Sequence, residues 1–81
     1  MDEKKQILRR IGVTIQAIRK GKGMTQVDLE IATGIANQDI SAIERGLVDL
    51  HFITLARIAK GLKVQVSDLY YIDYSEDGDT K

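Results

Sequence analysis

The stretch TQVDLEIATGIANQDISAIERG, residues 25–46, most constrains what this chain can fold into. It begins with Thr25, whose hydroxyl can accept a hydrogen bond from a first-turn N–H group, and Asp28 three residues later completes a capping-box pattern. Gly34 can adopt the left-handed conformation that closes a helix. Because isoleucines repeat at helical spacing in the second half, the stretch predicts two short helices joined by a tight turn.

The second of these predicted helices carries two different stripes of side chains. Ile40 and Ile43 form an apolar stripe that suits a protein core. The other stripe is polar, ends in a cation and consists of Asn37, Gln38, Ser41, Ala42 and Arg45. Core packing does not account for this polar stripe, so its side chains are candidates for binding.

A longer helix is expected before this stretch. Apolar residues recur along one helical face over residues 7–20, with the charged residues mostly elsewhere. Gly12 lies inside this helix, where glycine costs about 1 kcal/mol relative to alanine. This cost predicts that another helix approaches closely at Gly12.

Two more helices are expected after the stretch. One covers Phe52 to Lys60 and is broken by Gly61 and Lys63, and a short fifth helix covers residues 66–71. The sequence therefore predicts an all-α, compact domain of five helices.

Length and composition narrow the function classes. Eighty-one residues allow one small domain, and the lack of cysteine excludes a disulfide framework and a thiolate metal site. The sole histidine, His51, has no second imidazole with which to hold a metal, and its position indicates a helix start or a loop contact.

No apolar run approaches the ~20 residues of a membrane span, and no signal-peptide core is present. The chain is expected to be cytoplasmic, with no cofactor, metal or membrane partner.

The formal net charge of zero hides an uneven distribution. Residues 1–63 hold 11 Lys or Arg against 7 Asp or Glu, a balance of +4, whereas residues 64–81 hold 1 against 5, a balance of −4. Nucleic-acid-binding domains are commonly basic, and the acidic end of this chain conceals a basic domain.

The ordered motifs TQxxL, Gly-Ile and DISAIERG resemble the helix-turn-helix of the Xre and Cro family, the group that contains the lambdoid phage repressors. The resemblance covers roughly residues 7–70, and an ordered set of matches is more specific than a single motif. It implies a lambda-repressor-like five-helix domain in which helices 2 and 3 form the helix-turn-helix.

The resemblance also implies roles for particular side chains. Arg19 is expected to pair with Glu44 and so to tie the first helix to the end of the third. Free N–H groups at the start of the second helix favour an anion, so Gln26 is expected to touch a DNA phosphate. The expected DNA backbone contacts are Thr25, Gln26 and Arg45. The expected base contacts are Gln38, as the leading reader, with Asn37, Ser41 and Ala42.

Three features depart from the family pattern. Glu30 stands where many relatives have alanine, and a carboxylate there must reach solvent or find a cation. Ala36 replaces a capping serine, so Asn37 is expected to shift into the cap role and to be partly occupied by its own backbone. Residues 47–51 offer apolar side chains and one acid in place of phosphate-binding cations, which predicts weaker and less salt-dependent binding.

The chain divides into an N-terminal arm over residues 1–6, a helix-turn-helix domain over residues 7–72 and an acidic, disordered tail over residues 73–81. An aromatic cluster lies at the end of the domain and can act either as a lid on the core or as a homodimer contact, because tyrosine is enriched at interfaces. The expected dimer interface consists of Tyr70, Tyr71, Ile72 and Tyr74.

These observations favour a sequence-specific regulator of transcription that binds a palindromic double-stranded DNA operator as a homodimer, with helix 3 in the major groove. The alternative is a protein-interaction module, such as an antitoxin or a subunit that has lost DNA binding. The apolar 47–50 segment and the zero net charge support this alternative. An enzyme is the weakest hypothesis, because the sequence has no nucleophile and base pair, no glycine-rich phosphate loop and no evident small-molecule site.

Overall fold

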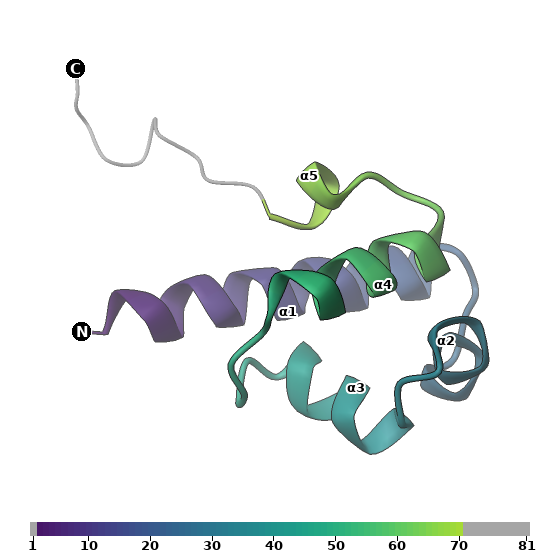
Figure 1. The fold of residues 1–81 in the computed structure, drawn as a ribbon, viewed down its shortest axis with the longest axis horizontal. Coiled ribbons are helices and arrows are strands. Elements are labelled where there is room, and N and C mark those ends of the chain that lie inside the picture. Colours follow the sequence, from purple (N-terminus) through teal and green to yellow (C-terminus); the bar gives the residue numbers. More distant parts are fainter. Residues whose placement is uncertain (1, 71–81) are drawn as a thin grey trace.

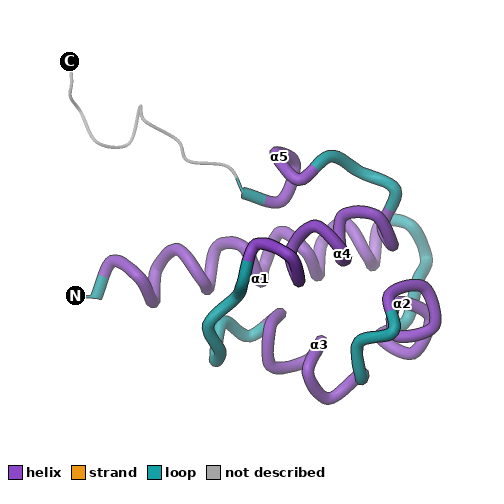
Figure 2. The backbone as a smooth tube through the Cα atoms, viewed as in Figure 1, coloured by secondary structure: helices purple, strands orange, loops and turns teal. Residues whose placement is uncertain are grey.

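Five α-helices form the part of the chain that the structure, a computed structural model, describes, residues 2–70 (Figures 1 and 2). They are α1 (Glu3–Gly21), α2 (Gln26–Thr33), α3 (Asn37–Glu44), α4 (Phe52–Leu62) and α5 (Val66–Leu69). No strand occurs within the described residues. The predicted all-α, five-helix fold is confirmed.

The core takes side chains from every helix. The six largest fully buried side chains are Ile15, Leu29, Ile40, Ile58, Leu62 and Leu69. Full burial of one such side chain stabilises the fold by ~1.5–3 kcal/mol. α2 packs against both α3 and α4, and α3 also packs against α1. The inner faces of α2 and α3 therefore pack on the core, and their outer faces remain exposed.

α1 begins earlier than its apolar stripe predicted. The expected start was Ile7, but the helix begins at Glu3, and the Asp2 carboxylate caps it by accepting a hydrogen bond from the Lys4 N–H at 2.9 Å. The Lys4 ammonium also pairs with Asp49, in the loop after α3, at 2.8 Å. Residues 3–6, expected to be an arm, thus form the first turn of α1. Apolar periodicity could not reveal this turn, because its side chains are exposed.

The close approach predicted at Gly12 is confirmed. A Cβ atom on Gly12 would clash with the backbone carbonyl oxygens of Ile43 and Glu44, at the end of α3. The absence of a side chain therefore lets the backbones of α1 and α3 touch.

The end of α4 corrects the sequence prediction. Gly61 does not break the helix but lies within it, and a Cβ atom there would come within 2.5 Å of Cγ2 of Thr33 on α2. The helix closes at Lys63, which adopts a left-handed conformation with φ of 61°. Gly61 is thus a second close-packing glycine, which joins α4 to α2. α5 ends at Leu69, with Tyr70 as its C-cap, and so is shorter than expected.

Candidate nucleic-acid interface

The start of α2 is fixed by its own first turn. The Thr25 hydroxyl accepts a hydrogen bond from the Asp28 N–H at 3.0 Å, and the Asp28 carboxylate accepts one from the Thr25 N–H at 2.8 Å. The hydrogen bond from the Thr25 backbone N–H lowers the pKa of Asp28, and the Thr25 side chain lowers this pKa further. The capping box predicted from the sequence is confirmed, so the Thr25 hydroxyl, which we expect to contact a DNA phosphate, is also an acceptor within the protein.

The turn between α2 and α3 is closed by glycine. Gly34 has φ of 77° and donates its N–H to the Glu30 carbonyl at 2.7 Å. The Thr33 hydroxyl accepts a hydrogen bond from the Ile35 N–H at 3.1 Å and so holds the next residue of the turn. The predicted tight turn is therefore built from a left-handed glycine and a threonine hydroxyl.

The first residue of α3 does not behave as predicted. Ala36 occupies the N-cap position without a side-chain cap, and Asn37 is the first helical residue. The expected shift of Asn37 into the cap role is wrong, because its side-chain amide instead donates a hydrogen bond to the Glu30 carboxylate at 3.0 Å. Glu30 has thus found an amide partner and not a cation. This bond joins α2 to α3 and leaves the Asn37 amide one further N–H group and its oxygen.

The polar stripe of α3 reaches the surface. Gln38 and Arg45 are exposed, and Ser41 and Ala42 are half-buried. The Arg45 guanidinium donates its Nε–H to the Ser41 carbonyl at 3.3 Å. Within residues 2–70, neither the Gln38 amide nor the Ser41 hydroxyl makes a hydrogen bond to the protein. These polar groups therefore remain available to a ligand.

The far end of α3 is anchored by a buried ion pair. Arg19 Nε lies 2.6 Å from Glu44 Oε2, and Arg19 Nη2 lies 3.0 Å from Glu44 Oε1. Only 6% of Arg19 and 4% of Glu44 is exposed. The hydrogen bond to Glu44 raises the pKa of Arg19. The two residues expected to pair are thus in two-point contact, which fixes the last turn of α3 relative to α1.

Two further groups complete this buried network. Arg19 Nη1 donates a hydrogen bond to the Met24 carbonyl at 2.8 Å, just before α2. The Gln26 amide, at the first position of α2, donates one to Glu44 Oε1 at 3.1 Å. The expected phosphate-binding residue is therefore also an internal partner of Glu44. Sequence reasoning missed this contact because it joins residues 18 positions apart.

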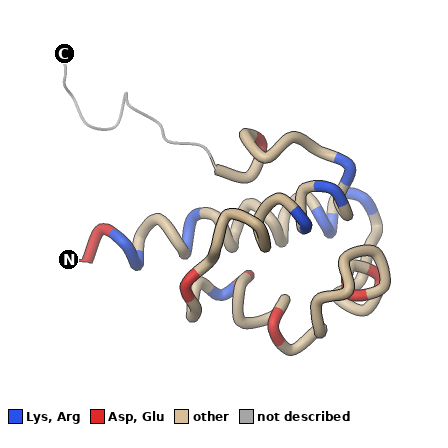
Figure 3. Tube along the Cα trace, in the orientation of Figure 1, with Lys and Arg blue, Asp and Glu red and all other residues tan. Residues whose placement is uncertain are grey.

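The charge of the helix-turn-helix itself is negative. Residues 23–44 contain four carboxylates, Asp28, Glu30, Asp39 and Glu44, and no Lys or Arg. In Figure 3, α2 and α3 accordingly carry acidic segments and no basic one, whereas cations lie on α1 and just after α3. Any Lys or Arg that contacts DNA phosphates beside this surface must therefore come from the flanking segments.

The remaining predicted site residues lie at the other end of the chain. Tyr70 is 45% exposed, directly after α5. Tyr71, Ile72 and Tyr74 lie outside the described residues. Within residues 2–70, no helix is long and apolar enough to cross a bilayer, and no group of three potential metal ligands occurs.

Comparison with known proteins shows that this chain is similar to helix-turn-helix proteins. A helix-turn-helix family model matches residues 15–69. The chain is 34% identical, over 59 residues, to an uncharacterised HTH-type transcriptional regulator of Sinorhizobium fredii, a match that covers 73% of this chain and 77% of the relative.

Solved structures show the same arrangement of helices. The restriction-modification controller protein C.Esp1396I superposes with a TM-score of 0.70 at 39% identity, covering 73% of this chain and 77% of that chain. The controller C.AhdI from Aeromonas hydrophila has a TM-score of 0.76 at 22% identity, covering 78% of this chain and 96% of that one. The second similarity concerns the fold alone.

Proposed function

Because the chain belongs to the Xre/Cro-type helix-turn-helix family of DNA-binding transcription regulators, we propose that it is a sequence-specific regulator that binds double-stranded DNA as a homodimer. In this proposal α3 lies in the major groove and α2 crosses the DNA backbone, as helix-turn-helix motifs dock. The protein would act in the cytoplasm, on a palindromic operator.

The observation that carries the proposal is the contrast between the two faces of α3. The inner face is fixed by the buried Ile40 and by the Arg19–Glu44 ion pair. The outer face presents Gln38 and Ser41 without hydrogen bonds to the described part of the protein. A rigid helix with unused donors and acceptors suits the reading of base edges, since discrimination depends on fixed hydrogen-bond geometry.

The chemistry of the outer face indicates which bases it prefers. Gln and Asn pair with adenine N6 and N7, and an alanine methyl can touch the thymine methyl, whereas guanine is best matched by Arg or Lys. Gln38 and Ala42 thus favour A·T pairs at the directly read positions. Asn37 supports them with the part of its amide that Glu30 does not use, and Arg45 is assigned to a phosphate.

The size of the proposed reading surface supports a homodimer. One α3 helix of 8 residues contacts a single half-site, whereas a two-fold dimer contacts two half-sites with centres about 34–36 Å apart. Tyr70 contributes an exposed aromatic side chain to the interface that we propose after α5. Tyr71, Ile72 and Tyr74 would complete it.

The test is a comparison of two duplexes. An operator is first selected from a random duplex library, and titrations on this operator and on a scrambled duplex follow. We expect Gln38→Ala to cost about 1–3 kcal/mol of binding free energy on the operator and almost nothing on the scrambled duplex. Ser67→Ala, at an exposed polar position on α5, serves as the control.

Equal losses for Gln38→Ala on both duplexes would remove this residue from base reading. If no operator is enriched and heparin does not retain the wild-type protein, the DNA-binding proposal fails. That result would favour a protein-interaction module, for which the exposed Leu47, Phe52 and Ile53 provide apolar surface.

A further inference from the structure

The acidic helix-turn-helix raises the question of which cations meet the DNA backbone. Phosphate contacts supply a large part of the affinity of most DNA-binding proteins. Residues 23–44 contain no Lys or Arg, so the cationic contacts to phosphates must come from elsewhere in the chain. The inference below rests on the proposed function and concerns the cations beside the end of α3.

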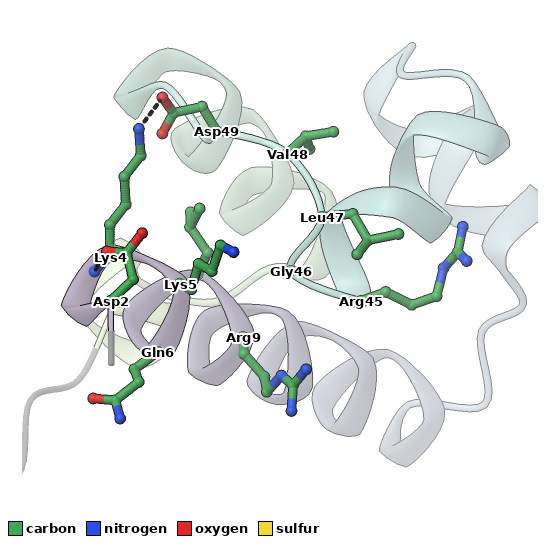
Figure 4. A pocket seen from close by; sticks show the side chains of 11 residues that line it. Asp2, Lys4, Lys5, Gln6, Arg9, Arg45, Gly46, Leu47, Val48 and Asp49 are labelled. Carbon is green, nitrogen blue, oxygen red and sulfur yellow. Dashed lines mark hydrogen bonds and ion pairs between the residues drawn. The ribbon is translucent and has the colours of Figure 1, made fainter.

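A groove lies where the first turns of α1 meet the segment that follows α3 (Figure 4). Its volume is about 670 Å³, and its lining includes Lys5 and Arg9 from α1 and Arg45 from the end of α3. Gly46 brings the two segments together, because a Cβ atom there would stand only 2.7 Å from the Arg9 Cα. The groove is therefore held by direct backbone contact between α1 and the α3 end.

The charge of the groove is positive once its acids are accounted for. The Asp49 carboxylate is paired with the Lys4 ammonium, and Asp2 caps the N-terminus of α1. Lys5, Arg9 and Arg45 form no ion pair with any residue in the 2–70 range, and all three are exposed. Three available cations thus share one concave surface, which suits an anion.

The groove continues the surface that we assign to DNA. Arg45 follows Gln38 by seven residues and Ser41 by four, so it extends the same helical stripe by one turn. Since Gly46 abuts Arg9, the stripe leads from the base-reading positions directly to the cations of α1. In the proposed docking, phosphates that flank the bases read by α3 would lie beside this groove.

We infer that Lys5 and Arg9 of α1, together with Arg45, form a binding site for DNA phosphates at the C-terminal end of α3. α1 thereby supplies the positive charge that the helix-turn-helix lacks. Asp49 in this arrangement does not repel the DNA backbone, because Lys4 neutralises it.

The salt dependence of DNA binding tests the site. Each phosphate contact makes the slope of log K against log salt more negative by about 0.9, and so contributes about eightfold in affinity at roughly 0.1 M salt relative to 1 M. The double variant Lys5→Ala with Arg9→Ala is expected to reduce the magnitude of this negative slope by about 2 and the affinity by roughly 60-fold. The loss should be similar on operator and on scrambled duplex, since phosphates carry no sequence information.

The matched control removes the same two charges from another surface. Arg57 and Lys60 are exposed on α4, and their double replacement by alanine changes the net charge equally. We expect it to leave the salt slope close to the wild-type value. Lys5→Arg with Arg9→Lys should also retain binding. Because the Lys5 and Arg9 side chains are exposed, we expect their replacement to leave the fold intact, and thermal melts of all variants check this.

The outcomes separate this inference from the proposed function. If wild-type protein binds its operator but the α1 variant and the α4 control lose equal affinity, the phosphate site is disproved while the DNA-binding proposal stands. If wild-type protein binds no duplex, the proposed function fails, and the inference fails with it. A selective loss of slope in the α1 variant supports both.

Discussion

At the scale of single residues, Glu44 has the most demanding environment in the described chain. The residue is 4% exposed, and its carboxylate accepts two hydrogen bonds from Arg19 and one from Gln26. A buried charge of this kind is tolerated only when its partners are present, because desolvation of an unpaired carboxylate is costly. The same network positions α3, so the stability of the fold and the geometry of the proposed base-reading surface depend on one group.

This dependence predicts the effect of breaking the pair. Arg19→Met and Glu44→Gln are each expected to lower the free energy of unfolding by about 3–5 kcal/mol, because each leaves a buried partner unsatisfied. The double variant should lose less than the sum of the two changes. Urea denaturation followed by circular dichroism measures the three values.

The exposed pair of Lys4 and Asp49 is the control for this cycle. Lys4→Ala removes an ion pair whose two side chains are 63% and 64% exposed, so stability should hardly change. Single variants at Arg19 and Glu44 that were as stable as wild type would show that the buried pair does not hold the helices.

At the scale of elements, side-chain hydrogen bonds join α2 to α3 at both ends of α3. The capping box begins α2, Gly34 closes it, and Asn37 donates its amide back to Glu30. α2 has only 8 residues, a length at which an isolated helix is marginal in water. Its caps and its packing on the core therefore determine whether the helix-turn-helix keeps its shape.

The capping box predicts a dependence of stability on pH. Hydrogen bonds from Thr25 lower the pKa of Asp28 in the folded protein. A carboxyl whose folded pKa lies below its unfolded pKa stabilises the fold above the unfolded pKa, and this contribution is lost as the pH falls through the folded pKa. Asp28→Asn should therefore lose stability at neutral pH and lose less than wild type on acidification.

Chemical denaturation at neutral pH and at steps through the acid range measures this difference. Thr25→Ser keeps both bonds of the box and serves as the control, with the pH dependence of wild type expected. Parallel curves for wild type and Asp28→Asn would show that this carboxylate does not contribute to the acid sensitivity of the fold.

At the scale of the whole molecule, the charges are segregated. Residues 1–63 have a charge balance of +4 and residues 64–81 have one of −4. The charged residues within 23–44 are all acidic. The cations next to α3 therefore come largely from α1, which is distant in sequence. α1 thus has two roles in our proposals, as the support of α3 and as a source of positive charge for the DNA backbone.

The proposed homodimer is tested by truncation. A chain that ends after Leu69 keeps all five helices of the described residues and the buried side chain of Leu69, but loses Tyr70 and the residues after it. We expect wild-type protein to sediment as a dimer and the truncated chain as a monomer with unchanged helical content. The truncated chain should also lose the preference for two half-sites about 34–36 Å apart.

An unchanged oligomeric state after truncation would move the interface to another surface, such as the exposed Phe52 and Ile53 at the start of α4. A wild-type monomer at high concentration would count against the two-half-site operator itself. Circular dichroism of the truncated chain separates loss of association from loss of fold.

The sequence by itself determined the features that depend on neighbouring residues. The capping box of Thr25 and Asp28, the closing Gly34 and the helical apolar stripes all arise from interactions within about four positions, so they are readable as local patterns. Gly12 was also readable, because glycine inside a helix carries a local cost that only close packing explains. The base-reading role of the α3 stripe stays a prediction.

Only the tertiary structure decided which distant groups meet. The Asn37 amide turned to Glu30 and not to its own backbone, Gln26 joined Glu44, and Gly61 served packing where a helix break was expected. The basic groove likewise exists only because Gly46 brings α1 against the end of α3. No local pattern encodes these contacts, because each depends on how helices already formed pack around the shared core.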